Sequence, residues 1–370
     1  MTALRICHVL WSVELGGAER VVLDLARAQR AMGHRVAVLT LGTTDGKMGS
    51  DFRETVDVFD AVSKRARGTD PTLPFRLARW FRRQRIEIVH THNELPLIYA
   101  APGGKLARLP VVHSKHGIVP VSPRAHQLRR AAALATDVFV AVSEATAQVA
   151  RELRECSPAK LRVVINGTDL SRFPAPPGTR ERIRDELGIP ASARVVITVG
   201  RLVVEKNHAH LLRSIAPLLG EERRLVLVGY GVLADDLKAL VGELRLERFV
   251  HLTGSRQDIP ALLSAADAFV LSSDSEGLPV GLIEAWAAGL PVVSTSVGGI
   301  PAAVENERTG ILVPPRDEAA MRMALSRVFE PGEEAVARMA EAGRQCARDT
   351  YSAEQMAAAY ESLYRSVSKA

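Results

Sequence analysis

The chain has 370 residues, 47% of them hydrophobic and 24% charged, with a net charge of +6. This length is too great for one ordinary hydrophobic core and predicts two domains. No apolar run approaches the roughly 18 to 20 residues of a membrane-spanning helix, and the N-terminus enters a strand pattern without a signal-peptide cleavage site. The three cysteines, Cys7, Cys156 and Cys346, lie far apart. This spacing excludes a disulfide framework and predicts a reducing, cytoplasmic setting.

Charge is shared unevenly along the chain. Residues 1–170 carry 25 basic and 16 acidic side chains, a net charge of +9, whereas the remainder carries −3. A basic half favours anionic partners such as lipid headgroups or phosphorylated acceptors, although an arginine-rich solvated surface explains it equally well. No nucleic-acid partner is expected.

The segment Arg76–Arg85 raises the question of membrane contact. It contains five arginines, with Leu77, Trp80 and Phe81 at helical spacing. Such a helix either lies on an anionic membrane surface or packs its apolar side chains inward against the sheet. We favour inward packing because a strand follows directly.

In chain order, the first half alternates apolar strand patterns with helical segments. A strand over 5–11 precedes a helix over 17–33. Further strands are predicted over 35–42, 86–93, 110–117, 136–143 and 161–169. Runs that are apolar on both faces and separated by helices indicate a parallel sheet covered on both sides.

Proline density at 174–178 marks a linker, after which the alternation restarts. Strands are predicted over 194–200, 224–231, 249–254, 267–273, 291–296 and 310–315. The predicted fold class is therefore α/β, with two Rossmann-like βαβ domains over residues 1–172 and 173–350. A C-terminal helix over 351–370 follows, and packing back on the N-terminal domain is one arrangement for it. Ligands are expected at the strand carboxyl ends in the crevice between the domains, which would close about residue 175 to exclude water.

Two glutamates stand out in the apolar, glycine-rich segment Asp274–Gly299. Glu276 lies in the turn before a helix predicted over 279–288, and Glu284 lies about two turns further on. The alternative interpretation is that Glu276 caps the helix and Glu284 is a surface residue. Core-like neighbours surround Glu284, and a buried, unpaired carboxylate costs several kcal/mol. It therefore requires a partner such as a sugar or ribose hydroxyl.

The start of the same helix offers an anion site. Backbone N–H groups at Leu278, Val280 and Gly281 would point out of the helix N-terminus, where the helix dipole favours negative charge. Pro279 contributes no N–H group. A phosphate group is the expected ligand.

The order of these motifs resembles that of the retaining glycosyltransferases of family 4, which have the GT-B fold. Each motif alone is weak, but eight or more occur in the family's order and cover nearly the whole chain. They are Glu276-x7-Glu284 with "AWAAGLPVVSTSVGGIPAAVENERTGILVPP", preceded by "HVLWSVELGGAER", "VHTHN", "HSKHG", "AVSEAT", "VINGTDLSRF", "VGRLVVEKN", "VGYG" and "LTGSRQDIPALLSAADAFVLSS".

The resemblance implies roles for the residues of these motifs. Arg201 and Lys206 would clamp the diphosphate and neutralise the leaving group. Glu276 would contact donor-sugar hydroxyls, and Glu284 the nucleotide ribose. His116 would lie near the anomeric centre, with His113 as its rival. The implied catalytic set is His116, Glu276, Arg201 and Lys206, and the implied donor-binding set is Gly16, Gly17, Arg201, Lys206, Gly229, Arg256, Gly277, Leu278, Val280 and Glu284, with His90 and His92 as pocket-wall residues.

The resemblance also implies the reaction. A sugar would pass from a nucleotide diphosphate donor, with a UDP-sugar favoured, to an acceptor hydroxyl with retained configuration. The acceptor would be a polysaccharide, a lipid-linked glycan or a glycolipid, or alternatively a small molecule such as an antibiotic aglycone or an aminocyclitol. We expect a cytoplasmic enzyme, with membrane association on the cytoplasmic face as a further option, that requires no metal or other cofactor.

Four rival functions remain to be separated. "GYGVLA" over 229–234 matches a dinucleotide fingerprint, but the next strand ends without the acidic residue that the fingerprint requires. A metal-dependent transferase would want a D-x-D motif, for which "DSE" over 274–276 is the nearest match. A sugar-nucleotide 2-epimerase shares the two-domain fold and would differ by its product. A non-catalytic sugar-nucleotide binder would not require the whole set of charged residues.

Overall fold

A computed structural model describes residues 2–65, 68–117, 122–330 and 334–368. The chain divides into two compact units. Residues up to Thr168, together with those from Ala353 onward, form unit 1, and Asp169–Ser352 form unit 2. The first crossing lies four residues before the predicted boundary at 172, and the return lies two residues after the predicted boundary at 350. The predicted C-terminal helix belongs to unit 1, and its last two residues lie outside the described part of the chain.

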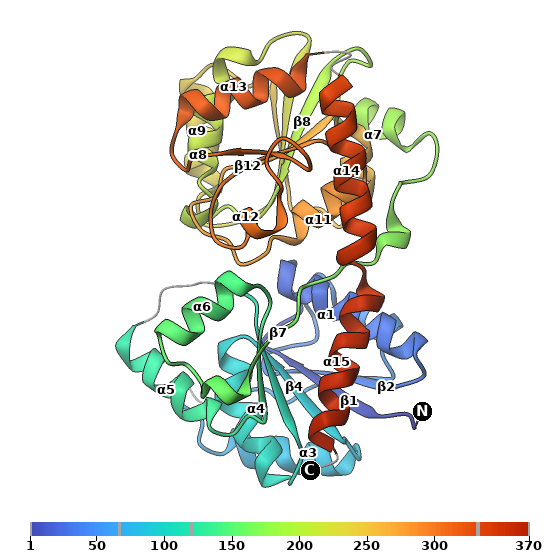
Figure 1. The fold of residues 1–370 in the computed structure, drawn as a ribbon, viewed down its shortest axis with the longest axis vertical. Helices are drawn as coiled ribbons and strands as arrows, with labels where there is room; N and C mark the ends of the chain where they lie inside the picture. Colours follow the sequence, from blue (N-terminus) through green and yellow to red (C-terminus); the bar gives the residue numbers. More distant parts are fainter. Residues whose placement is uncertain (1, 66–67, 118–121, 331–333, 369–370) are drawn as a thin grey trace. The chain divides into compact units, whose positions relative to one another are not determined.

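Unit 1 is built on a parallel sheet with helices on its faces (Figure 1). In the described residues this sheet has seven strands in the order β3-β2-β1-β4-β5-β6-β7. The strands are β1 (Arg5–Leu10), β2 (Arg35–Thr40), β3 (Val58–Ala61), β4 (Ile88–His92), β5 (Val111–Lys115), β6 (Val138–Ala141) and β7 (Leu161–Val163). The helices are α1 (Gly17–Ala31), α2 (Gly49–Thr55), α3 (Leu73–Arg83), α4 (Glu94–Leu106), α5 (Pro123–Ala133), α6 (Glu144–Glu152) and α15 (Ala353–Ser368).

Helix α3 shows which interpretation of the arginine-rich segment holds. Leu77 and Phe81 are fully buried and Trp80 is 8% exposed. The indole of Trp80 donates a hydrogen bond from Nε1 to Asp60 Oδ2 at 2.7 Å. The apolar side chains therefore pack inward, as we favoured, and are not available for insertion into a membrane.

Strand β3 was not predicted as a strand. All four of its residues are partly exposed, because β3 lies at the edge of the sheet and, in the part of the chain that the structure describes, pairs with β2 alone. An edge strand lacks the continuous apolar run that identifies a buried parallel strand.

Unit 2 repeats the plan. Its parallel sheet has, among the described residues, six strands in the order β10-β9-β8-β11-β12-β13. They are β8 (Arg194–Val199), β9 (Arg223–Val228), β10 (Val250–Gly254), β11 (Ala268–Leu271), β12 (Val292–Thr295) and β13 (Ile311–Val313). The helices are α7 (Thr179–Leu187), α8 (His208–Ile215), α9 (Ala234–Glu243), α10 (Ile259–Ala265), α11 (Val280–Ala287), α12 (Ile300–Ala303), α13 (Glu318–Phe329) and α14 (Glu334–Thr350).

Helix α11, which carries Glu284, is fixed by a large buried side chain. Trp286 is fully buried and donates from Nε1 to the carbonyl oxygen of Thr309 at 2.8 Å. Helix α14 packs over it through Gly343, where an added Cβ atom would lie 2.3 Å from the Trp286 ring. A side chain of any size at Gly343 would therefore displace the indole and with it the helix.

Each sheet has one point where the direction of strand order reverses. In unit 1 it lies between β1 and β4, and in unit 2 between β8 and β11. Ligands of open α/β sheets bind outside the strand carboxyl ends at such points. Within the described ranges, no helix combines the length and apolar character needed to cross a bilayer.

Candidate active site

The strand ends of unit 2 are brought together by glycine. An added Cβ atom at Gly229 would lie 1.8 Å from the carbonyl oxygen of Gly200, and one at Gly231 would lie 2.2 Å from that of Leu202. The turn after β9 thus packs backbone to backbone on the turn after β8. This contact accounts for the G-x-G pattern of "GYGVLA" without a dinucleotide, since only glycine permits so close an approach.

The centre of the unit 2 site is an ion pair. Lys206, after β8, lies with its Nζ 2.5 Å from Glu276 Oε1, after β11. Ser273 Oγ donates to the same carboxylate oxygen at 2.6 Å. Glu276 is 7% exposed, and a Cβ atom at Gly298, whose φ is +56°, would lie 1.8 Å from its carbonyl oxygen. The turn that holds Glu276 therefore requires glycine at 298, which sequence reasoning did not single out.

A second cation lies at the end of β8 without a carboxylate. Arg201 is exposed, and its guanidinium has no ion pair or hydrogen bond within the described residues. Asp274, two residues before Glu276, is engaged by Asn207 Nδ2 at 3.1 Å and by Arg316 at 2.9 Å. Lys206 is thus held by a carboxylate, whereas Arg201 is available to an anion from solution.

Glu284 has a protein partner that the sequence did not reveal. It is 5% exposed, and its Oε1 lies 3.4 Å from Arg172 Nη1. The buried carboxylate was expected to require a partner such as a sugar or ribose hydroxyl, and Arg172 is a partner within the protein that supplies a positive charge. Contact with a ribose remains a prediction.

The remaining predicted donor residues of unit 2 lie in different settings. Gly277 and Leu278 are buried in the turn that leads to Pro279, and α11 begins at Val280. Arg256 is held by two carboxylates: Asp258 at 2.7 Å and Glu186 on α7. These two hydrogen-bonded carboxylates raise the pKa of Arg256. A donor contact from Arg256 would have to compete with both of them.

In unit 1 the predicted glycines open helix α1. Gly16 is the N-cap residue in an extended conformation, and Gly17 is the first residue of the helix. A Cβ atom at Gly16 would meet the carboxylate of Glu19, the flexible end of a side chain. Their predicted contact with the donor remains a prediction.

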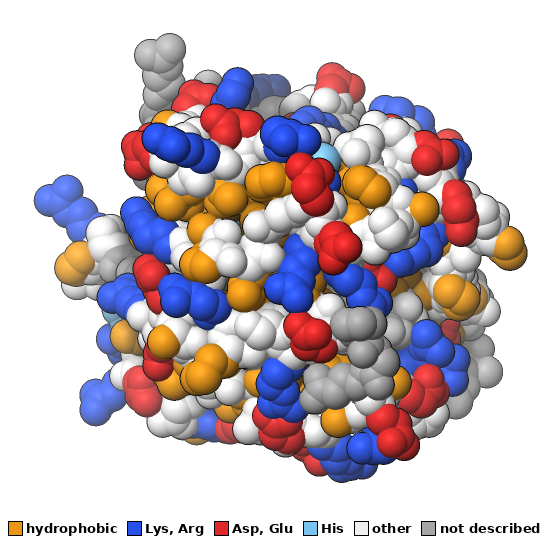
Figure 2. Space-filling view, turned by 90° about the horizontal axis from the view of Figure 1, so that it is seen from above, with side chains coloured by type: hydrophobic (Ala, Val, Ile, Leu, Met, Phe, Trp, Pro, Cys, Tyr) orange, Lys and Arg blue, Asp and Glu red, His pale blue; other side chains and the backbone are white. Residues whose placement is uncertain are grey.

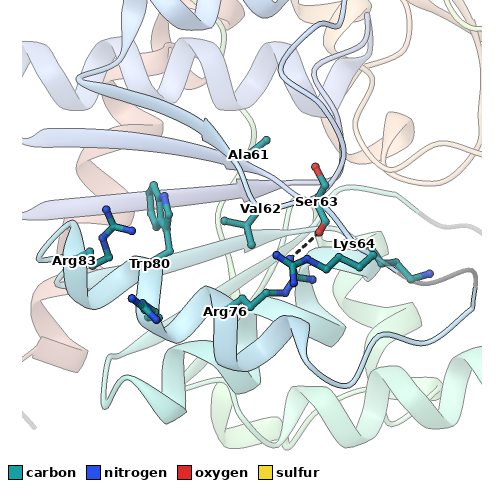
Figure 3. Close-up of a pocket in the computed structure, with 9 residues that line it drawn as sticks. Ala61, Val62, Ser63, Lys64, Arg76, Trp80 and Arg83 are labelled. Atoms are coloured by element: carbon teal, nitrogen blue, oxygen red, sulfur yellow. Dashed lines mark hydrogen bonds between the residues drawn. The ribbon is translucent and has the colours of Figure 1, made fainter.

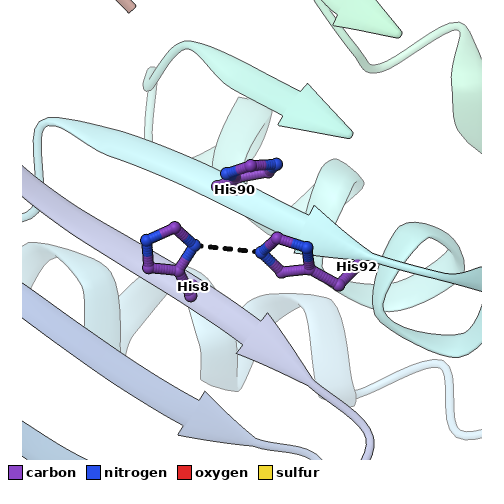
Figure 4. Close-up of side chains that lie close together, drawn as sticks. All are labelled: His8, His90 and His92. Carbon is purple, nitrogen blue, oxygen red and sulfur yellow. Dashed lines mark hydrogen bonds between the residues drawn. The ribbon is translucent and has the colours of Figure 1, made fainter. Parts of the chain in front are cut away.

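Three buried histidines gather where β1 meets β4 (Figure 4). His8 and His90 are partners in the strand register, and His92 follows two residues along β4. His8 Nδ1 and His92 Nε2 are hydrogen bonded at 2.9 Å. Burial lowers the pKa of His8 to about 4 and holds the pKa values of His90 and His92 well below their ordinary value. The cluster is therefore neutral at pH 7.

The geometry distinguishes the two candidate active-site histidines. His116 Nε2 is hydrogen bonded to His92 Nδ1 at 2.9 Å, which connects it to the buried cluster. His113 bonds instead to Thr91 Oγ1 at 3.0 Å and packs edge-on against Phe139. His116 is partly exposed, whereas His113 is 3% exposed. A substrate group can reach His116 more readily.

The three histidines are of the residue type that binds metal ions, but their ring nitrogens are already engaged in hydrogen bonds. One ligand atom from each of His8, His90 and His92 lies within 4.8 Å of the others, and imidazole suits Zn²⁺ and other transition metals. However, all six ring nitrogens are hydrogen bonded: those of His90 to Tyr364 and Ser114, and the others as described above or to Gln29. Every metal–nitrogen bond would replace one of these. The expectation that no metal is required remains a prediction.

A separate hollow of about 430 Å³ lies between β3 and α3 (Figure 3). Five basic residues line it, with Trp80, Ala61, Val62 and Ser63. The Arg76 guanidinium donates hydrogen bonds to the carbonyl oxygen of Ser63 and to Asp70. The Lys64 side chain extends away from Trp80. The charged ends of Lys64 and Arg76 thus lie apart (Figure 3), and none of the predicted site residues is among those that line the hollow. Basic and acidic side chains are interspersed over the exposed face drawn in Figure 2.

Comparison with known proteins identifies the class of protein. The Anabaena protein HepE, in a crystal structure with UDP and glucose, superposes with a TM-score of 0.87, 22% identity and coverage of 98% of this chain and 100% of that one. A glycosyltransferase from Rickettsia africae gives a TM-score of 0.84, 19% identity and coverage of 99% of both chains. The fold is GT-B.

Sequence comparison then gives the family. The "Glycosyltransferase Family 4" profile matches residues 15–172, and the "Glycosyl transferases group 1" profile matches residues 179–346. A UDP-Gal:alpha-D-GlcNAc-diphosphoundecaprenol alpha-1,3-galactosyltransferase from Escherichia coli is 30% identical over 69% of each chain. A D-inositol 3-phosphate glycosyltransferase from Corynebacterium aurimucosum is 31% identical over 82% of this chain and 80% of its own. The chain belongs to the family 4 type of glycosyltransferases, and it is an enzyme that transfers hexosyl groups.

Proposed function

We propose that the enzyme transfers a hexose from a UDP-sugar to an acceptor hydroxyl with retention of configuration. The observation that carries the proposal is the Lys206–Glu276 ion pair, which lies where the strand order of unit 2 reverses. The exposed Arg201 precedes Lys206 in the same segment after β8. Cations at this position would neutralise the charge that develops on a leaving diphosphate. Glu276, oriented by Lys206 and Ser273, would accept hydrogen bonds from sugar hydroxyls.

The choice of UDP follows relatives. The Escherichia coli relative is named for UDP-Gal, and HepE was crystallised with UDP-glucose. Retention would proceed by front-face displacement, in which the leaving phosphate takes the proton of the attacking hydroxyl. Because Arg201 and Lys206 supply positive charge, we propose that no metal ion is needed.

The acceptor is a lipid-linked sugar or a growing polysaccharide in the first form of this proposal. The Escherichia coli relative acts, by its name, on a diphosphoundecaprenol-linked sugar. A small-molecule acceptor is the second form, since other relatives are named for D-inositol 3-phosphate and for L-malate. The acceptors for which these three relatives are named all carry an anionic group, in keeping with the basic first half of the chain.

A two-stage experiment tests the proposal. Nucleotide sugars are first screened for thermal stabilisation, and acceptors of both classes are then tested with the best donor. We expect a UDP-sugar to stabilise the protein most and the product to keep the anomeric configuration of the donor by NMR. Inversion of configuration would contradict the mechanism. An epimerised nucleotide sugar formed without an acceptor would establish the 2-epimerase, and binding without turnover would establish a binding protein.

A further inference from the structure

Gln29, on helix α1, joins the histidine cluster to the C-terminal helix. Its Oε1 lies 2.8 Å from His8 Nε2, and its Nε2 donates to the hydroxyl of Tyr364 at 3.3 Å. The side chain is 1% exposed. Because an amide oxygen can only accept and an amide NH₂ can only donate, this orientation requires the proton of His8 to be on Nε2.

The direction of each hydrogen bond then follows from the one before it. A neutral imidazole has one donor and one acceptor nitrogen. With its proton on Nε2, His8 accepts at Nδ1, so His92 must donate from Nε2 at 2.9 Å. His92 consequently accepts at Nδ1, and His116 must donate from Nε2, also at 2.9 Å. The Nδ1 atom of His116 is left with a lone pair.

The second arm of the network has a consistent direction. Tyr364 accepts from Gln29 and donates to His90 Nδ1 at 2.7 Å. His90 then donates from Nε2 to Ser114 Oγ at 2.7 Å, and Ser114 donates to the Tyr360 hydroxyl at 2.7 Å. Every donor named in this arm has an acceptor. Among the described residues the two arms meet at Gln29. Its amide sets the direction of the first arm and is compatible with this direction of the second, in which hydroxyl groups can both donate and accept.

The first arm ends at a ring nitrogen of His116. His116 Nδ1 is buried and has no hydrogen-bond partner among the described residues. The backbone N–H of His116 donates to Asn93 Oδ1 at 3.2 Å, which holds the residue against the start of α4. Burial lowers the pKa of His116 to about 4. The ring is therefore neutral and fixed, with one nitrogen uncommitted.

We propose that Gln29 is a positioning residue that, through His8 and His92, fixes the tautomer of His116 so that its Nδ1 accepts a hydrogen bond from a substrate hydroxyl. The inference rests on the proposed function for the identity of that hydroxyl. The tautomer itself does not depend on it. An amide suits this task because, unlike a fourth histidine, it has no second protonation state through which the direction of the chain could reverse.

The test is a direct measurement of the tautomer in the full chain labelled with ¹⁵N-histidine. Two-bond ¹H–¹⁵N correlation distinguishes a protonated ring nitrogen from an unprotonated one. We expect His116 in the unmodified protein to be protonated at Nε2 and unprotonated at Nδ1. In Gln29→Leu the His116 signals should become those of mixed tautomers. The kcat should fall about tenfold, the scale of one net hydrogen bond, with the KM for the nucleotide sugar unchanged.

Ser114→Ala is the matched control, because it deletes one partner of a buried histidine on the other arm. Its His116 signals should match those of the unmodified protein. A proton on His116 Nδ1 in the unmodified protein, or an unchanged tautomer in a folded Gln29→Leu variant, would overturn the proposal. Stoichiometric Zn²⁺ that shifts the His8, His90 and His92 nitrogen signals would also overturn it, since ligation replaces these hydrogen bonds.

If Gln29→Leu fails to fold, the spectrum of the unmodified protein still decides the direction of the chain. The spectrum requires no substrate. An absence of sugar transfer would therefore count against the proposed function alone, whereas the wrong tautomer would count against this inference alone.

Discussion

Units 1 and 2 have the same strand order around their switch points but place opposite chemistry there. In unit 2 the strand ends carry charge: Lys206 against Glu276, with an exposed Arg201. In unit 1 they carry a neutral, buried chain of histidines that ends at His116. The shared topology thus determines where side chains converge. The residues at those positions determine whether the site can bind a charged ligand group or can orient an uncharged one.

Substitutions at the charged site of unit 2 should have the largest effect on turnover. We expect Lys206→Ala to lower kcat at least about 100-fold, the scale of one lost electrostatic contact to the transition state. The change also leaves the carboxylate of Glu276, 7% exposed, without its cation. Steady-state kinetics with the best donor checks this. Lys238→Ala, an exposed lysine of α9, is the control, and near-unmodified turnover in Lys206→Ala would refute the assignment.

A smaller effect is expected at Glu284. If its carboxylate accepts from ribose hydroxyls, Glu284→Ala should weaken UDP binding about tenfold, the scale of one charged hydrogen bond. The same variant should bind 2′,3′-dideoxy-UDP no more weakly than the unmodified enzyme does. Calorimetric titration of both nucleotides onto both proteins forms a cycle that separates contact from folding effects. Equal weakening for the two nucleotides would exclude the ribose contact.

The free energy of unfolding of unit 1 should depend on pH, because its buried histidines are neutral in the folded chain. The pKa of His8 is about 4 in the folded chain against an ordinary value of 6.5, because burial disfavours its charge. Between these values the unfolded chain binds a proton that the folded chain does not. Stability is therefore complete above pH 6.5 and is lost as pH falls toward 4, by up to about 1.4 kcal/mol per pH unit for each such histidine.

The measurement is urea unfolding of a Trp286→Phe variant, whose remaining tryptophans, Trp11 and Trp80, both lie in unit 1. As the pH is lowered, the stability should already decline between pH 6.5 and 5, before ordinary carboxylates begin to titrate. Constant stability over that interval would contradict the neutral cluster, and His8→Gln should make the decline shallower.

The smallest effect is expected from metal removal. Since Arg201 and Lys206 can supply the positive charge at the strand ends of unit 2, excess EDTA should leave the turnover of the proposed reaction unchanged. The comparison is between enzyme assayed in EDTA and enzyme assayed in Mg²⁺ or Mn²⁺. A loss of activity in EDTA that either ion restores would show that protein cations alone do not suffice.

Local patterns in the sequence predicted much of this structure. Apolar runs identified every strand except β3, whose edge position removes the signal. The βα-turn positions of Lys206 and Glu276 followed from their place after strands. The predictions failed where a partner is distant in the chain. Neither Arg172 beside Glu284 nor Gln29 beside His8 has a local signature, because these contacts depend on how helices pack against a sheet.

The return of α15 to unit 1 makes that unit discontinuous. Its tyrosines, Tyr360 and Tyr364, complete hydrogen bonds to Ser114 and His90, yet the ribosome makes them only after all of unit 2. Unit 2 can therefore fold during synthesis while unit 1 waits for its last helix. For recombination between relatives, Asp169–Ser352 is one continuous cassette, whereas a chimera that exchanges unit 1 must carry two segments of chain together.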